Sequence, residues 1–197
     1  MEFRFDFEKS LQAAAFLLHL EDGIMPSMRL LKLLYIAERE LLAQKATPLT
    51  GDIYLAMEHG PVLSHVHDLI KGNGARSTEW ENFIQRTGYA VKLLRQPGRG
   101  HLPSEVIDKL AEVSSRYREK DHWGIRDLTH DFPEWQKNYP GDGGSALIAL
   151  EDILEAQGED SETLEVIREA EAVRRHMNKI IGAKKPQVGL ETVESVS

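Results

Sequence analysis

Hydrophobic residues recur along most of this chain at intervals of three and four, which is the spacing of amphipathic helices. Residues 10–20 follow this spacing, and Gly23 comes after them as a stop signal. Ser27 follows Pro26 and can cap a second helix, in which the large apolar residues of the stretch 30–42 cover more than one face. We therefore predict that this second helix lies at the centre of the hydrophobic core.

The pattern changes in the middle of the chain. The stretch 53–57 is apolar and aromatic and predicts a strand, and Pro61 suits the first turn of a helix that ends near Gly72. Residues 71–77 are rich in glycine and predict a loop, residues 80–85 fit either a strand or a short helix, and residues 89–94 predict a strand. We expect these strands to form one small antiparallel sheet.

The second half returns to helical spacing. Helices are predicted from Ser104, around residues 125–130, over 146–156 with Ser145 as the cap, and from near Ser161. The fold class expected is mainly α, of the α+β type, with a compact helical domain, a small antiparallel β-sheet and a long C-terminal helix. The domain spans 1–158, an amphipathic helix 159–182, and a disordered tail 183–197. The C-terminal helix either packs on the domain or docks a partner, including a second copy of the chain.

Composition narrows the functional classes. The 197 residues are 41% hydrophobic, enough for one core, and the absence of cysteine excludes disulfides, thiolate zinc sites and cysteine nucleophiles. The first residues mix acids with aromatics, unlike a signal peptide, and no segment approaches the ~20 apolar residues of a membrane span, so we expect a cytoplasmic protein. The formal net charge of −8 disfavours attraction to a nucleic-acid backbone and favours a basic protein partner.

No catalytic or metal-binding signature stands out. His65 and His67 are two residues apart, which places them on different faces of a helix. His59, His122 and His130 lack the spacing of a zinc site, and the fingerprints of serine hydrolases, P-loops and dinucleotide-binding folds are absent. We therefore expect no enzyme activity, no metal and no cofactor, although a hydrolase with an unrecognised site stays open.

Three blocks of the sequence occur in a specific order: LLKLLYIA at 30–37, MEHGPV at 57–62 and DLTHDFPEW at 127–135. Together they resemble the Panacea domain, the SocA-like antitoxin family, over roughly residues 11–154. The chain departs from the family pattern at Met57 and His59, where a tryptophan and a tyrosine are frequent, and at Leu31, where a glutamine is common.

The resemblance implies a cytoplasmic bacterial or phage-encoded antitoxin that binds a cognate toxin protein and performs no catalysis. We expect neutralisation by direct protein–protein binding. One alternative is a proteolytic adaptor that delivers the toxin to a protease. Another is a DNA-binding autoregulator, which would be favoured if the strand pair flanks a helix as a wing.

The candidate partner contacts come from the second and third blocks and from one aromatic residue before each of them. They are Tyr54, Met57, Glu58, His59, Gly60, Pro61, Trp123 and Trp135. Three of these residues also have a structural explanation. Gly60 and Pro61 predict a tight turn, and Trp135 with Thr129 and His130 can form a capping and packing unit instead of a binding site.

Overall fold

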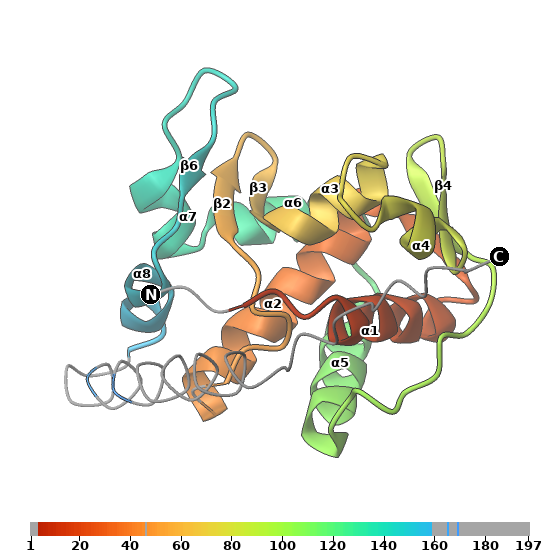
Figure 1. Cartoon of the computed structure of the whole chain (residues 1–197). Coiled ribbons are helices and arrows are strands. Elements are labelled where there is room, and N and C mark those ends of the chain that lie inside the picture. The colour runs from red at the N-terminus through yellow and green to blue at the C-terminus, as the bar shows by residue number, and fades with distance from the viewer. Residues whose placement is uncertain (1–3, 46, 159–164, 166–168, 170–197) are drawn as a thin grey trace, which may run out of the picture.

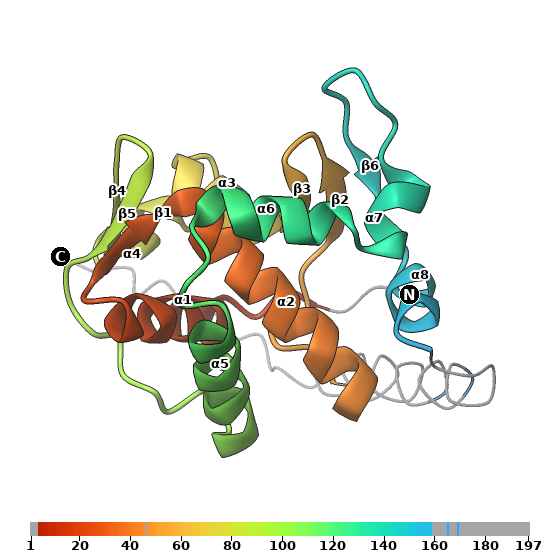
Figure 2. The ribbon, with the colours of Figure 1, turned by 180° about the vertical axis from the view of Figure 1, so that it is seen from behind.

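Two long helices, α1 (Phe7–Leu20) and α2 (Ser27–Lys45), form the centre of the protein in a computed structural model that describes residues 4–45, 47–158, 165 and 169. Every residue from Arg29 to Glu38 is buried, so α2 is enclosed on all sides along more than half of its length. Figures 1 and 2 show α2 crossing the middle of the molecule, with α5 on one side of it and α6 on another. The expectation of a central second helix is confirmed.

Shorter helices surround this pair. They are α3 (Ser64–Lys71), α4 (Ser77–Glu81), α5 (Ser104–Arg116), α6 (His122–His130), α7 (Pro133–Asn138) and α8 (Leu150–Ala156). The helices α5, α6 and α8 contact α2 directly, and α5 also contacts α1. No helix of the described residues combines the length and the apolar character that crossing a lipid bilayer requires.

Within the described residues, the strands form two antiparallel sheets of three strands each. The first sheet has the order β1-β5-β4, with β1 at Ile24–Pro26, β4 at Ile84–Thr87 and β5 at Ala90–Leu93. The second has the order β3-β2-β6, with β2 at Tyr54–Met57, β3 at Gly60–Leu63 and β6 at Ala146–Leu147. Both contain a hairpin, β4–β5 and β2–β3, and Figure 1 shows the two hairpins rising on the same side of the molecule.

The secondary structure agrees with the predictions in some parts of the chain and differs from them in others. The mainly helical α+β class is confirmed, as are the helices near residues 10–20, 104–116 and 125–130 and the strand near 89–94. Pro61 was wrongly assigned to a helix: it lies in β3, opposite Ala56, and the helix begins only at Ser64. The single sheet is also wrong, because the two hairpins do not pair with each other. The strand β1, which the sequence did not indicate, extends the β4–β5 hairpin, and β6 extends the β2–β3 hairpin.

Two further differences occur near the C-terminal end of the domain. The helix expected over 146–156 is divided, since Ala146–Leu147 form β6 and the helix α8 starts at Leu150. The short helix α7, which carries Trp135, was not predicted. The expected helix at 159–182 and the tail at 183–197 lie outside the described residues, apart from Glu165 and Glu169.

A buried carboxylate of α2 fixes the approach to β2. Glu38 accepts hydrogen bonds from the Thr50 amide at 2.7 Å, the Thr50 hydroxyl at 2.9 Å and the Tyr54 hydroxyl at 2.8 Å. Burial raises the pKa of Glu38, and these hydrogen bonds oppose that rise because they favour the ionised form. The contact ties the first residue of β2 to the central helix.

A second buried carboxylate joins α7 to α2. Arg39 donates to Glu134 through Nε at 2.6 Å, and the Tyr35 hydroxyl donates to the same oxygen at 3.3 Å. Arg39 also donates to Oε1 of Gln157, just beyond α8, at 3.0 Å. Burial, reinforced by the negative charge of Glu134, raises the pKa of Tyr35. This cluster therefore holds two segments, α7 and the residue that follows α8, against one turn of α2.

The buried ion pair gives a test of this arrangement. The substitution Glu134→Gln removes the charge that compensates Arg39, and we expect the free energy of unfolding to fall by about 3 kcal/mol. Urea denaturation followed by circular dichroism measures the change. The matched control is Glu79→Gln, which breaks an exposed pair with Arg76 and should cost far less. Equal losses in the two variants would contradict the importance of the buried cluster.

Candidate functional site

The β2–β3 hairpin presents the MEHGPV block of the sequence at its turn. Met57 pairs with Gly60 across the hairpin, which leaves Glu58 and His59 at the turn, where both side chains are exposed. Gly60 has a φ of +90°, a backbone conformation that residues with a Cβ atom rarely adopt. The glycine therefore lets the chain reverse tightly at this turn.

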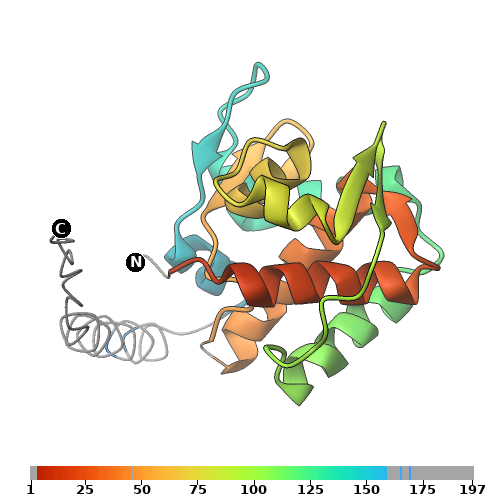
Figure 3. The same ribbon diagram turned by 45° about the vertical axis from the view of Figure 1, so that its right-hand side comes forward.

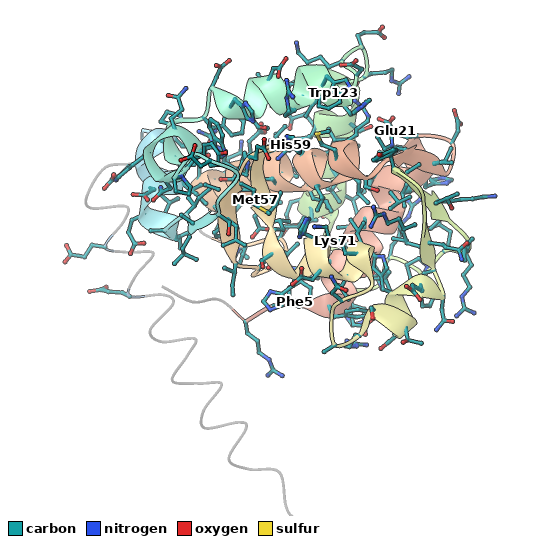
Figure 4. The ribbon with its side chains drawn as sticks, turned by 90° about the horizontal axis from the view of Figure 1, so that it is seen from above. Phe5, Glu21, Met57, His59, Lys71 and Trp123 are labelled. Atoms are coloured by element: carbon teal, nitrogen blue, oxygen red, sulfur yellow. The ribbon has the colours of Figure 1, made fainter. Side chains whose placement is uncertain are left out.

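Helix α6 lies beside this turn and contributes an aromatic side chain. The ring centroids of Trp123 and His59 are 6.4 Å apart in an edge-on arrangement, and Trp123 is 46% exposed. The neighbouring His122 ring lies 5.1 Å from the indole, and the Arg126 guanidinium lies 4.7 Å above it. Figure 4 shows Met57, His59 and Trp123 on the same side of the molecule. We call Met57, Glu58, His59, His122, Trp123 and Arg126 the hairpin–α6 surface.

The start of α6 is fixed locally. The Asp121 side chain accepts a hydrogen bond from the Gly124 amide at 2.7 Å, which caps the helix immediately before His122 and Trp123. Ile125 on the opposite side of α6 is fully buried. Trp123 is therefore held in place by the cap and the buried face of its helix, although its own indole is largely accessible.

The hairpin rests on a tightly packed floor beneath its turn. A Cβ atom built on Gly60 would lie 2.7 Å from Thr129 Oγ1, 2.9 Å from Lys32 Nζ and 3.2 Å from His130 Cδ2. Lys32 Nζ donates to the Pro61 carbonyl at 2.7 Å, and Thr129 Oγ1 donates to the Arg126 carbonyl at 2.8 Å. The absence of a side chain at Gly60 is thus what allows β3 to lie against both α2 and α6.

Lys32 is an unusual residue to find in this floor. Its side chain is almost completely buried, and burial lowers its pKa to about 7. The hydrogen bond to Pro61 satisfies one of its donors, and no carboxylate lies within ion-pair distance of it among the described residues. An ionisable group therefore supports the hairpin from below.

A stack of rings supports the hairpin from the side. The His130 and Trp135 rings are parallel with centroids 4.1 Å apart, and Tyr139 also stacks on Trp135, with centroids 4.9 Å apart. Trp135 Nε1 donates to the Met57 carbonyl at 2.9 Å. The indole thus connects α7 to the end of β2, which agrees with the packing interpretation of Thr129, His130 and Trp135.

The predicted contact residues fall into two groups. Met57, Glu58, His59 and Trp123 come together at the hairpin–α6 surface, where Met57 is half-buried and the other three are exposed. The others lie inside or below it. Tyr54 is 4% exposed with its hydroxyl bound to Glu38, Gly60 and Pro61 are buried, and Trp135 is half-buried.

Sequence reasoning missed three residues of this region: Lys32, His122 and Arg126. A four-residue spacing on a predicted helix places His122 and Arg126 on one face beside Trp123, but the helix was expected to begin only near residue 125. Lys32 was read as part of an apolar helix. Its partner is a backbone carbonyl 29 residues away, which no local pattern indicates.

The described histidines do not form a metal-binding cluster, although His59 and His122 both contact Trp123. His65 bonds Asp52 through Nδ1 at 2.7 Å, His67 faces Asp68, and His59, His122 and His130 make ring contacts with tryptophans. In the part of the chain that the structure describes, no group of three or more histidine, aspartate or glutamate side chains is placed to hold a metal ion.

Comparisons with known proteins give one match. A family model described as antitoxin SocA-like, Panacea domain, matches residues 30–136, which is more than half of the chain. The matched region runs from α2 through α7 and includes all of the hairpin–α6 surface and Trp135. No curated protein and no solved structure matches the chain.

Gly60 provides a test of the floor. In Gly60→Ala the new methyl group meets Thr129 and Lys32 and the backbone is held at positive φ, so we expect the free energy of unfolding to fall by about 3 kcal/mol. The control is Gly23→Ala, where φ is +84° and nothing lies within 4 Å of the added Cβ. Chemical denaturation of both variants separates packing from backbone strain, and similar losses would argue against close packing at Gly60.

Lys32 gives the stability a specific pH dependence. Its pKa is about 7 in the folded chain and about 10.4 when unfolded. Between these pH values the unfolded chain holds more protons, so the free energy of unfolding rises with pH, by up to about 1.4 kcal/mol per unit. Relative to Lys32→Met, which cannot titrate here, the unmodified protein should gain stability from pH 7 to 10. Parallel stability curves would contradict a buried, weakly basic Lys32.

Proposed function

Because the chain belongs to the antitoxin SocA-like, Panacea domain family, we propose that it neutralises a cognate protein toxin by direct binding. The family match supports the antitoxin role in general and is in keeping with a protein that binds rather than catalyses. The observation that supports direct binding is the hairpin–α6 surface, where an exposed tryptophan is held in a fixed position by its surroundings.

The side chains of this surface suit a protein interface. Tryptophan and arginine are enriched among the residues that contribute most to protein–protein binding, and Trp123 and Arg126 lie against each other here. Met57 adds a flexible apolar side chain at the end of β2. We infer that the toxin covers Trp123 and His59 and that Met57 and Glu58 lie at the edge of the contact.

The remaining predicted residues act from beneath the interface. Tyr54 is bonded to Glu38, Pro61 to Lys32 and Trp135 to the Met57 carbonyl, so each holds a different part of the hairpin. Gly60 permits the hairpin to approach α2 and α6. A surface fixed in this way loses little conformational freedom on binding, which favours affinity. We therefore assign Tyr54, Gly60, Pro61 and Trp135 a positioning role.

Charge supports a basic toxin as the partner. The formal net charge of −8 accelerates encounter with a positively charged protein, mainly at low ionic strength. The chain would form this complex whether it neutralises the toxin by covering its surface or by delivering it to a protease. The two outcomes differ in the half-life of the toxin, which only delivery to a protease shortens.

Growth rescue tests the proposed role. Each reading frame that adjoins the gene is expressed from an inducible promoter, with and without this chain. We expect one of them to arrest growth and co-expression of this chain to restore it. If no neighbouring product is toxic, or if none is neutralised, the antitoxin proposal fails.

Trp123 tests the proposed interface with the toxin found in that experiment. The substitution Trp123→Ala should weaken binding by roughly 30-fold, because a central tryptophan contributes about 2 kcal/mol or more. Isothermal titration calorimetry measures the affinity, and thermal unfolding checks that the fold is kept. Tyr89→Ala, which removes an exposed aromatic residue of the other sheet, is the control. An unchanged affinity for Trp123→Ala places the interface elsewhere.

A further inference from the structure

Positive charge is concentrated in one segment of this acidic protein. Residues 82–104 contain four cations and no aspartate or glutamate, although the chain has 32 acids and 24 bases. The cations are Arg86, Lys92, Arg95 and Arg99. The net charge of −8 therefore describes the whole molecule and not this segment, which includes β4, β5 and the loop after them.

These four cations are exposed and lack carboxylate partners among the described residues. Arg86 donates to the Gly88 carbonyl at 3.0 Å, and the guanidinium groups of Arg95 and Arg99 lie over aromatic rings at 4.3 Å and 4.6 Å. Other surface cations behave differently, since Arg76 and Arg116 each contact two carboxylates. The charge of the segment is therefore not neutralised by the protein itself.

The β4–β5 hairpin carries an aromatic residue at its turn. Tyr89 follows Gly88 and is 94% exposed, yet its carbonyl accepts a hydrogen bond from the Ser27 amide at 2.8 Å. The backbone of the turn is thus attached to the start of α2 while the phenol points into solvent. Figure 3 shows this hairpin, which we call the ribbon, standing beside α1. The strand β1 pairs with β5 and completes the three-stranded sheet.

We propose that this ribbon binds duplex DNA through the phosphate backbone, with Arg86, Lys92, Arg95 and Arg99 as phosphate contacts and Tyr89 at the groove. Most protein surfaces mix charges of both signs, so a 23-residue segment without a carboxylate suits a partner whose repeating charge is uniformly negative. Duplex DNA is such a partner.

The surroundings of the ribbon agree with this assignment. The order α1, β1, α2, α3, β4, β5 with the sheet order β1-β5-β4 is that of a winged helix–turn–helix, interrupted by the β2–β3 hairpin and by α4. Helix α3 packs against β4, so a helix and the ribbon lie next to each other. Helix α4 carries the acidic residues Glu79 and Glu81, and Glu79 is paired with Arg76. The basic surface is therefore limited to the ribbon and the loop after it.

Salt-dependent binding tests the proposal. A fluorescein-labelled 24-bp duplex is titrated with the full chain and followed by fluorescence anisotropy between 50 and 200 mM salt. We expect a dissociation constant of roughly 10 μM at low salt, with a steep loss of affinity as salt rises. The combined variant Arg86→Gln, Lys92→Gln, Arg95→Gln should weaken binding at least 10-fold and reduce the salt slope by about 2 to 3.

The control variant carries the same change of net charge on exposed residues outside the segment: Lys45→Gln, Arg118→Gln, Lys120→Gln. It should bind DNA almost as the unmodified chain does. Equal weakening by the two variants, or no binding by the unmodified chain at 50 mM salt, overturns the proposal. Binding of poly-glutamate with no binding of DNA would overturn it in favour of an acidic protein partner. The outcome is independent of the toxin, because the ribbon variant should still rescue growth.

Discussion

The polar side chains buried along α2 are the constraint on which the rest of this structure depends. A helix enclosed on all sides leaves its charged and hydroxyl groups away from water, where each needs a hydrogen-bonding partner to avoid a large desolvation cost. Arg29, Lys32, Glu38 and Arg39 find their partners in different segments of the chain. These partners lie in other segments of the chain. The hydrogen bonds to the buried groups of α2 therefore place the turn before α6, the strands β2 and β3, and α7 around this helix.

The hairpin–α6 surface is a consequence of this arrangement. Glu38 holds the beginning of β2 through Tyr54, Lys32 holds β3 through the Pro61 carbonyl, and Trp135 holds the end of β2 through the Met57 carbonyl. Trp135 is itself placed by α7, which Glu134 attaches to Arg39. The exposed residues Glu58 and His59 therefore stand on a hairpin that is anchored on both strands and at its end, so their positions follow from contacts that are entirely internal.

The sequence predicted what depends on local spacing and missed what depends on distant contacts. The period of apolar residues located α1, α2, α5 and α6, because helical periodicity is a property of neighbouring residues. Pro61 misled the prediction, since proline suits both the first turn of a helix and a strand position. Its place opposite Ala56 is set by the tight turn at Gly60 and by Lys32. The contact of Tyr35 with Glu134, 99 residues later, has no local signature at all.

The net charge of the chain likewise does not tell how its charged residues are distributed over the fold. The total of −8 argues against nucleic acid only if charge is spread evenly, and the fold does not spread it evenly. Glu40 and Glu112 both contact Lys109 and Arg116, whereas the cations of the β4–β5 hairpin have no carboxylate beside them among the described residues. A ligand within a Debye length of about 10 Å responds to that local field, while an approaching protein responds to the whole molecule. The proposed basic toxin and the proposed DNA ligand are therefore compatible with one chain, because they respond to different features of its charge.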